Sequence, residues 1–105
     1  MKAGSPDRDA IVRELAERGF AAVTVSGGCM QPALLDGQMV LVHRERAPRR
    51  GDLALLDCRG TLELHRLGVH LGPWWLHKGD ASRHWGLVRR GEILGIVQAD
   101  GGSPA

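Results

Sequence analysis

Cys29 is the residue whose surroundings most suggest chemistry. It lies within VSGGCMQPALLDGQMVLVHR, residues 25–44, directly after Gly27 and Gly28. Successive glycines let the backbone turn tightly and leave N–H groups free, and an oxyanion hole is built from such groups. A thiol becomes a strong nucleophile once a base has taken its proton. The candidate bases are His43, His65, His70, His77 and His84. From these residues alone, a structural cysteine fits as well as a catalytic one.

His65 and Asp80 are two further polar candidates, and each also has a simpler structural interpretation. His65 lies in LELHRL, on the strand face that also carries Thr61 and Glu63. An isolated histidine on a strand is more often a surface residue than a base. Asp80 lies in HKGDAS, and an aspartate in such a turn usually bonds the nearby backbone.

The elements that must position these residues are one helix and a series of short strands. Ser5 and Pro6 favour a helix start, and an apolar stripe that includes Ile11 and Leu15 predicts a helix over 6–18. The predicted strands cover residues 20–25, 39–43, 52–57, 61–67, 74–78 and 93–99, with a turn at 71–73 and a loop over 79–92. Short strands with frequent turn signals predict a mainly β protein with an antiparallel, barrel-like or sandwich sheet.

Length, charge and hydropathy limit the class of protein. The 105 residues favour one domain over 6–98, with flexible ends at 1–5 and 99–105. A net charge of +2 with scattered basic residues argues against a nucleic-acid partner. The chain has no apolar run near the roughly 20 residues that span a bilayer, and its charged N-terminus is unlike a secretory signal. We therefore expect a cytoplasmic protein without cofactor or metal, whose Cys29 and Cys58 are thiols.

Five segments in order resemble the signal peptidase I superfamily, which includes the LexA-type self-cleaving repressors. They are GGCMQPALLDGQMVLV, RRGDLALL, LELHRL, HKGDAS and ILGIV, and the resemblance covers about residues 20–98. It implies a barrel-like antiparallel sheet with one N-terminal helix. It also places Cys29 where the family has its nucleophilic serine, with Met30 and Pro32 at the matching positions after it.

The same resemblance implies the remaining roles. His65 and Arg66 match the base position of the endoplasmic-reticulum branch, which uses histidine where the bacterial branch uses lysine. Asp80 matches the acidic residue that helps that histidine. The two lysines of this chain, Lys2 and Lys78, lie outside the base strand. A serine–lysine type of dyad is therefore replaced here by a cysteine–histidine pair.

Three positions depart from the family pattern. Cys29 itself replaces serine, and Gly27 stands where several signal peptidases carry a hydroxyl that supports the oxyanion. Gln38 replaces the usual aspartate after a glycine, in a turn. We therefore expect the oxyanion to depend on backbone N–H groups, chiefly that of Cys29, beside Gly28. The predicted oxyanion and substrate-binding residues are Gly28, Met30, Pro32 and Arg66.

The function expected from these residues is a soluble endopeptidase that cleaves a leader or propeptide. We expect no membrane anchor like that of ordinary signal peptidases, because the helix predicted at 6–18 stands in its place. Substrate would bind as an extended peptide at a sheet edge. One alternative is a non-catalytic peptide-binding module of the same fold. A regulatory or nucleic-acid-associated domain is another, although the chain offers no recognition helix.

Overall fold

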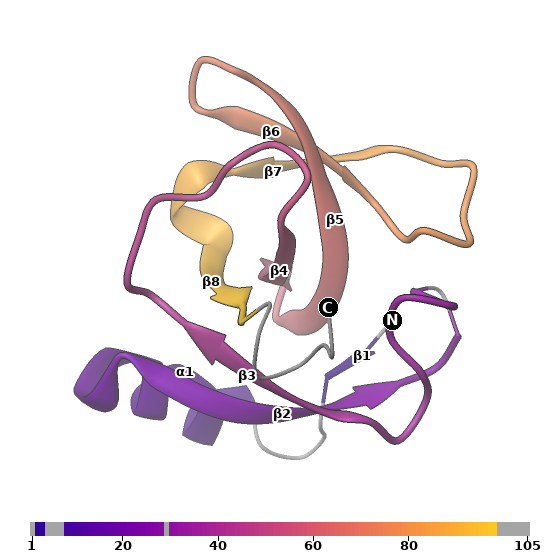
Figure 1. The fold of residues 1–105 in the computed structure, drawn as a ribbon. Helices are drawn as coiled ribbons and strands as arrows, with labels where there is room; N and C mark the ends of the chain where they lie inside the picture. The colour runs from indigo at the N-terminus through magenta and orange to yellow at the C-terminus, as the bar shows by residue number, and fades with distance from the viewer. Residues whose placement is uncertain (1, 4–7, 29, 99–105) are drawn as a thin grey trace.

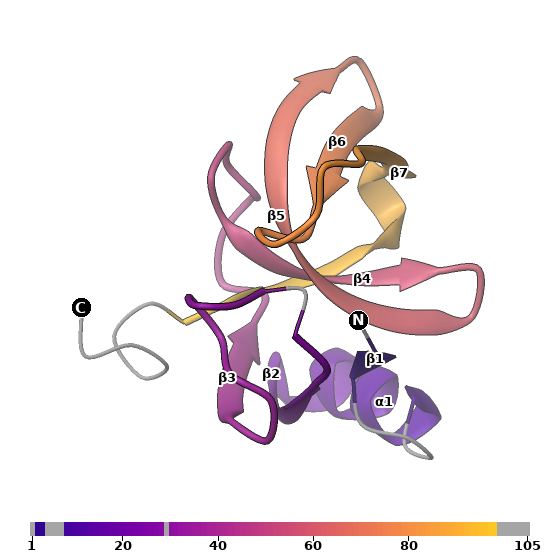
Figure 2. The same cartoon turned by 90° about the vertical axis from the view of Figure 1, so that its right-hand side faces the viewer.

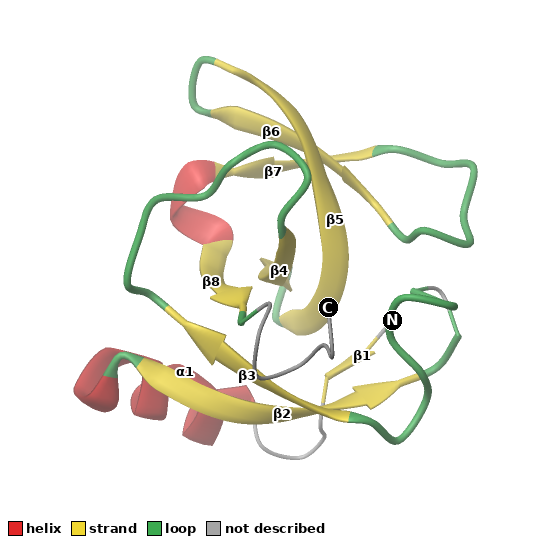
Figure 3. Ribbon diagram, viewed as in Figure 1, coloured by secondary structure: helices red, strands yellow, loops and turns green. Residues whose placement is uncertain are grey.

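The computed structural model describes residues 2–3, 8–28 and 30–98 of the chain. Across these residues the chain forms one eight-stranded sheet, an α-helix and a short 3-10 helix (Figures 1 and 3). The elements are β1 (Lys2–Ala3), α1 (Arg8–Arg18), β2 (Phe20–Ser26), β3 (Met39–His43), β4 (Leu53–Cys58), β5 (Thr61–Leu71), β6 (Trp74–Lys78), β7 (Gly86–Arg89), η1 (Arg90–Glu92) and β8 (Ile93–Val97).

The sheet is antiparallel throughout and remains open. Its strand order is β1-β2-β3-β8-β4-β5-β6-β7, so β1 and β7 are the two ends. Figures 1 and 2 show the long strand β5 curving from the half of the molecule that holds β1, β2 and α1 to the half that holds β6 and β7. The prediction of a mainly β, antiparallel fold with one N-terminal helix is confirmed, and the curved sheet stops short of a closed barrel.

The segment 79–92 differs from the prediction, which made all of it a loop. It contains β7 and η1, and β7 pairs with β6 from Trp74↔Arg89 to His77↔Gly86. Only Val88 is buried among the four residues of β7. A strand this short at a sheet edge, with one buried side chain, has too little alternation to be recognised from its sequence.

Two hydrophobic clusters lie on opposite sides of β4 and β5. In β5, Leu64 packs into the first cluster, beneath α1, β2 and β3, whereas Leu67 packs into the second, against β6, β7 and β8. The same division occurs in β4, where Leu55 belongs to the first cluster and Leu56 to the second. Side chains that alternate along a strand point to opposite faces, so β5 carries two chemically separate surfaces.

The helix α1 covers the first cluster with a narrow apolar stripe. Ile11 and Leu15, the two residues named for the predicted stripe, are its buried residues. The predicted helix start at Ser5 and Pro6 lies outside the described residues. Among the helices that the structure describes, none is both long and apolar enough to cross a membrane.

Candidate active site

The loop between β2 and β3 contains the predicted nucleophile position. Cys29 itself lies outside the described residues, but its neighbours are placed. The backbone N–H of Gly27, at φ +92°, donates to Oδ1 of Asp36 at 2.9 Å, and the N–H of Gln31 donates to the carbonyl oxygen of Gly28 at 3.2 Å. Met30 is completely buried in the first cluster. The loop is therefore held on both sides of position 29.

Asp80 connects this loop to β5. The N–H of Asp80 donates to Sδ of Met30 at 3.3 Å. Its carboxylate accepts two hydrogen bonds from Arg66, one from Nε at 2.8 Å and one from Nη2 at 2.7 Å. Arg66 also donates from Nη1 to the carbonyl oxygen of Gly51, just before β4, at 2.9 Å. Three of the predicted site residues, Met30, Arg66 and Asp80, are thus brought together.

The Arg66–Asp80 pair is an ion pair with two parallel hydrogen bonds. The guanidinium of Arg66 lowers the pKa of Asp80, so that carboxylate is ionised at neutral pH. This differs from the predicted arrangement, in which Asp80 orients His65. Pro32, the remaining residue of the predicted substrate-binding set, is exposed at the surface of the loop.

His65 lies on the other face of β5 and contacts a second histidine. Its Nδ1 lies 2.9 Å from Nδ1 of His77 on β6, and the two rings stack at a centroid distance of 5.1 Å and an angle of 30°. Its Nε2 lies 3.6 Å from Oε1 of Glu63, two residues earlier on the same face. The predicted base is therefore set among polar groups, and only 14% of its side chain is exposed.

Burial determines the charge of this histidine pair. The pKa of His65 is lowered to about 4, chiefly by burial, and the neighbouring His77 contributes in the same direction. Burial also lowers the pKa of His77, against a smaller opposite effect of Glu63. Both rings are therefore neutral at neutral pH. Because a neutral imidazole has one N–H and one bare nitrogen, one Nδ1 of the pair donates and the other accepts.

The position of the His77 ring depends on Gly86 in the neighbouring strand β7. A Cβ atom at Gly86 would lie 2.7 Å from both Cε1 and Nε2 of His77. The ring therefore packs directly on the backbone of β7, where only glycine leaves room. Sequence reasoning included His77 only as one of five candidate bases. The available signal was the alternation of WWLHK, which places His77 on the same face as the buried Trp75.

A groove of about 500 Å³ opens beside His77. Glu63, His77 and Gly86 line it, together with Cys58 and Trp74. Burial first, and then the nearby carboxylate of Glu63, raise the pKa of the Cys58 thiol to about 12. Cys58 is therefore a protonated, weakly reactive thiol at neutral pH.

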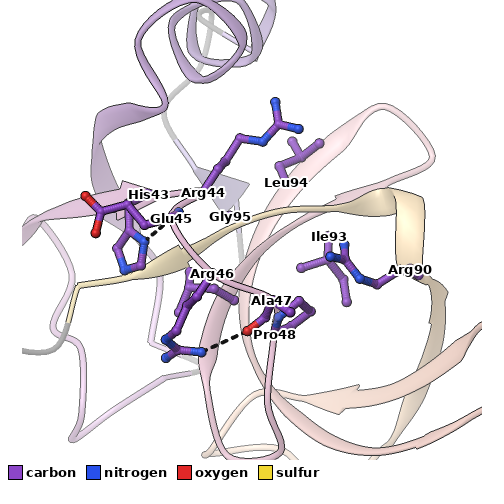
Figure 4. Close-up of a pocket in the computed structure, with 11 residues that line it drawn as sticks. His43, Arg44, Glu45, Arg46, Ala47, Pro48, Arg90, Ile93, Leu94 and Gly95 are labelled. Atoms are coloured by element: carbon purple, nitrogen blue, oxygen red, sulfur yellow. Dashed lines mark hydrogen bonds between the residues drawn. The ribbon is translucent and has the colours of Figure 1, made fainter.

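A second cavity lies away from all of these groups. It has a volume of about 330 Å³ and lies between the segment from His43 to Pro48 and the strand β8, with Arg90 at one side (Figure 4). None of the described residues predicted for the site lines it. Within the described part of the chain, no group of three or more histidine, cysteine or acidic side chains is arranged to hold a metal ion.

The open antiparallel sheet with one N-terminal helix fits a peptidase-like fold. A family model described as Peptidase S24-like matches residues 5–82. The chain belongs to this family, and the resemblance to the signal peptidase and LexA superfamily is confirmed. The matched range includes all seven predicted site residues. No curated protein and no solved structure matched the chain.

Proposed function

We propose that this protein is a cytoplasmic endopeptidase that cleaves a leader or propeptide, with Cys29 as nucleophile and His65 as general base. The observation that carries the proposal is the setting of His65. It is a neutral, largely buried histidine on β5, at the position to which the resemblance assigns the base, and its Nδ1 lies 2.9 Å from Nδ1 of His77. The family match supports a peptidase-like fold around it.

The proposed reaction follows the chemistry of a cysteine–histidine pair. Nε2 of His65 takes the proton of the Cys29 thiol, and the sulfur attacks the scissile carbonyl carbon. Backbone N–H groups of the loop at Gly28 stabilise the tetrahedral oxyanion. The imidazolium of His65 then gives its proton to the leaving amine, and the C–N bond breaks. Water, deprotonated by His65, hydrolyses the thioester and restores the thiol.

The test follows the alkylation of Cys29 by iodoacetamide against pH, in a Cys58→Ser background. An ordinary thiol becomes reactive near pH 8.5 or so. We expect Cys29 to react well below that pH and His65→Gln to slow it at pH 7 by about tenfold or more. His70→Gln is the matched control, since His70 lies exposed on the same strand. Equal rates in the His65→Gln and parent proteins would contradict the proposed pair.

Turnover is tested separately with a peptide library and mass spectrometry. We expect cleavage of extended peptides by the parent protein and none by Cys29→Ala, whose fold is checked by circular dichroism. Cleavage that persists in Cys29→Ala would exclude Cys29 as the nucleophile.

A non-catalytic peptide-binding module is the second candidate. The observation that favours it is the burial of His65, whose side chain is 14% exposed, because burial lowers the pKa of the ring and makes it a weak base. This candidate predicts peptide binding without turnover, with the same affinity in Cys29→Ala. Cleavage of a peptide by the parent protein would support the endopeptidase, and binding without cleavage would support the binding module.

A further inference from the structure

We infer that His77 is the residue that orients the base: its bare Nδ1 accepts a hydrogen bond from the Nδ1–H of His65. This inference rests on the proposed function and adds to it a positioning residue in the place that the resemblance gave to Asp80. The two Nδ1 atoms lie 2.9 Å apart, a normal hydrogen-bond distance.

The position of Asp80 supports this assignment. Both carboxylate oxygens of Asp80 accept hydrogen bonds from Arg66, at 2.8 and 2.7 Å. Arg66 follows His65 directly on β5, so the two side chains point to opposite faces of the strand. The side chains of Arg66 and Asp80 therefore lie on the opposite face of β5 from the imidazole of His65. There Asp80 also contacts Met30 through its backbone N–H.

The direction of the hydrogen bond decides whether His65 can act as a base. If His65 donates from Nδ1, its Nε2 carries a lone pair and can take a proton from the thiol. If His77 donates instead, the hydrogen of His65 is on Nε2 and the base is blocked. In the inferred arrangement one proton moves, from Sγ of Cys29 to Nε2 of His65 and then to the leaving amine. The proton between the two histidines stays on His65, and His77 remains neutral.

Burial keeps the resting ring of His65 neutral, so its positive charge exists only during proton transfer. Glu63 on β5 places Oε1 3.6 Å from Nε2 of His65 and attracts the imidazolium. From β4, Cys58 faces Glu63 as a neutral thiol. From β6, His77 is kept neutral by burial, so it accepts a hydrogen bond without adding a second positive charge. From β7, the uncharged backbone at Gly86 packs on the ring of His77.

Two substitutions of His77 separate its hydrogen bond from its bulk. His77→Leu fills the space without an acceptor, whereas His77→Asn keeps an oxygen acceptor close to the place of Nδ1. In the Cys58→Ser background at pH 7, we expect His77→Leu to slow alkylation of Cys29 by about tenfold, the effect of one lost hydrogen bond. We expect His77→Asn to stay within about threefold of the parent, because the acceptor is retained. His70→Leu and His70→Asn are the matched controls on the same hairpin.

The tautomer of His65 gives a readout that a merely structural role would not change. ¹⁵N NMR at neutral pH distinguishes the Nδ1–H from the Nε2–H form of each histidine. We expect the Nδ1–H form for His65 in the parent protein and in His77→Asn, and loss of that preference in His77→Leu. An Nε2–H form of His65 in the parent protein would overturn the inference even if the alkylation rates agreed with it.

The failure of this inference and that of the proposed function give different results. If His65→Gln slows alkylation but His77→Leu does not, the cysteine–histidine pair stands and His77 has no part in orienting it. If neither variant changes the rate, the proposed pair itself fails. If His77→Leu and His77→Asn slow the reaction equally, the packing of the ring matters and its acceptor does not, which also overturns the inference.

Discussion

His65 and Arg66 are adjacent in sequence, yet they belong to two separate polar groups because they point to opposite faces of β5. Arg66 forms an ion pair with Asp80 beside the buried Met30, whereas His65 faces Glu63 and His77. Burial has the largest effect on the charge of His65, because it lowers the pKa of the ring and keeps the imidazole neutral. The charged pair joins Asp80 to β5, whereas proton transfer is the task that we propose for the neutral pair.

Gly86 gives a prediction at the scale of one residue. In Gly86→Ala, the new Cβ would lie 2.7 Å from two atoms of the His77 ring, so the ring or the strand β7 must shift. We expect a loss of about 1–3 kcal/mol in the free energy of unfolding and slower alkylation of Cys29. Urea unfolding and the alkylation assay measure the two effects.

Gly91→Ala is the matched control for that substitution. A Cβ atom at Gly91 would meet nothing within 4 Å, so both measurements should be close to those of the parent protein. A Gly86→Ala protein with unchanged stability and unchanged reactivity would show that His77 is not held by the backbone of β7.

At the scale of elements, the hairpin β5–β6 brings the two histidines together. Its strands pair with Leu67 opposite His77, so His65 is the diagonal neighbour of His77. The register shifts between Leu67 and His70, where one strand bulges. A contact that depends on such a shift cannot be deduced from alternation alone, which explains why the sequence placed His65 on a strand face but did not predict its partner.

Elements with clear boundaries were predicted well. The strands Met39–His43 and Trp74–Lys78 agree with the structure residue for residue, because turn residues flank short apolar runs. The strand β5 extends to Leu71, four residues beyond the prediction, and the pairing of β1 with β2 was not expected. Both differences arise from pairing with a neighbouring strand, which local sequence does not record.

The Arg66–Asp80 pair gives a prediction at the scale of elements, because it joins β5, the turn after β6 and the backbone before β4. We expect Asp80→Asn to lower the free energy of unfolding by about 1 kcal/mol, since one side of a partly exposed ion pair is removed. Urea unfolding at neutral pH measures it. Asp9→Asn is the control, because Asp9 is 85% exposed in its pair with Arg8 and should change little. Equal losses in the two variants would contradict an anchoring role for Asp80.

At the scale of the whole molecule, the buried histidines make stability depend on pH. The pKa of His65 is about 4 in the folded protein and near 6.5 in the unfolded chain, so the unfolded chain binds more protons between these values. The free energy of unfolding should therefore fall as the pH is lowered from about 6.5 to about 4, and the contribution of His65 should be fully present above that range. The lowered pKa of His77 acts in the same direction.

Urea unfolding of the parent protein, His65→Gln and His77→Gln from neutral pH down to about pH 4.5 tests this dependence, above the range where most carboxylates titrate. Each variant loses contacts, so its stability is expected to be lower at every pH, and the slope against pH is the informative quantity. We expect a flatter slope in both variants, because a glutamine takes up no proton, and an unchanged slope in His70→Gln, whose histidine is exposed in the native fold. Parallel curves for His65→Gln and the parent would show that His65 titrates alike in the folded and unfolded chain. A buried neutral base would then be excluded, together with the orienting role of His77 that depends on it.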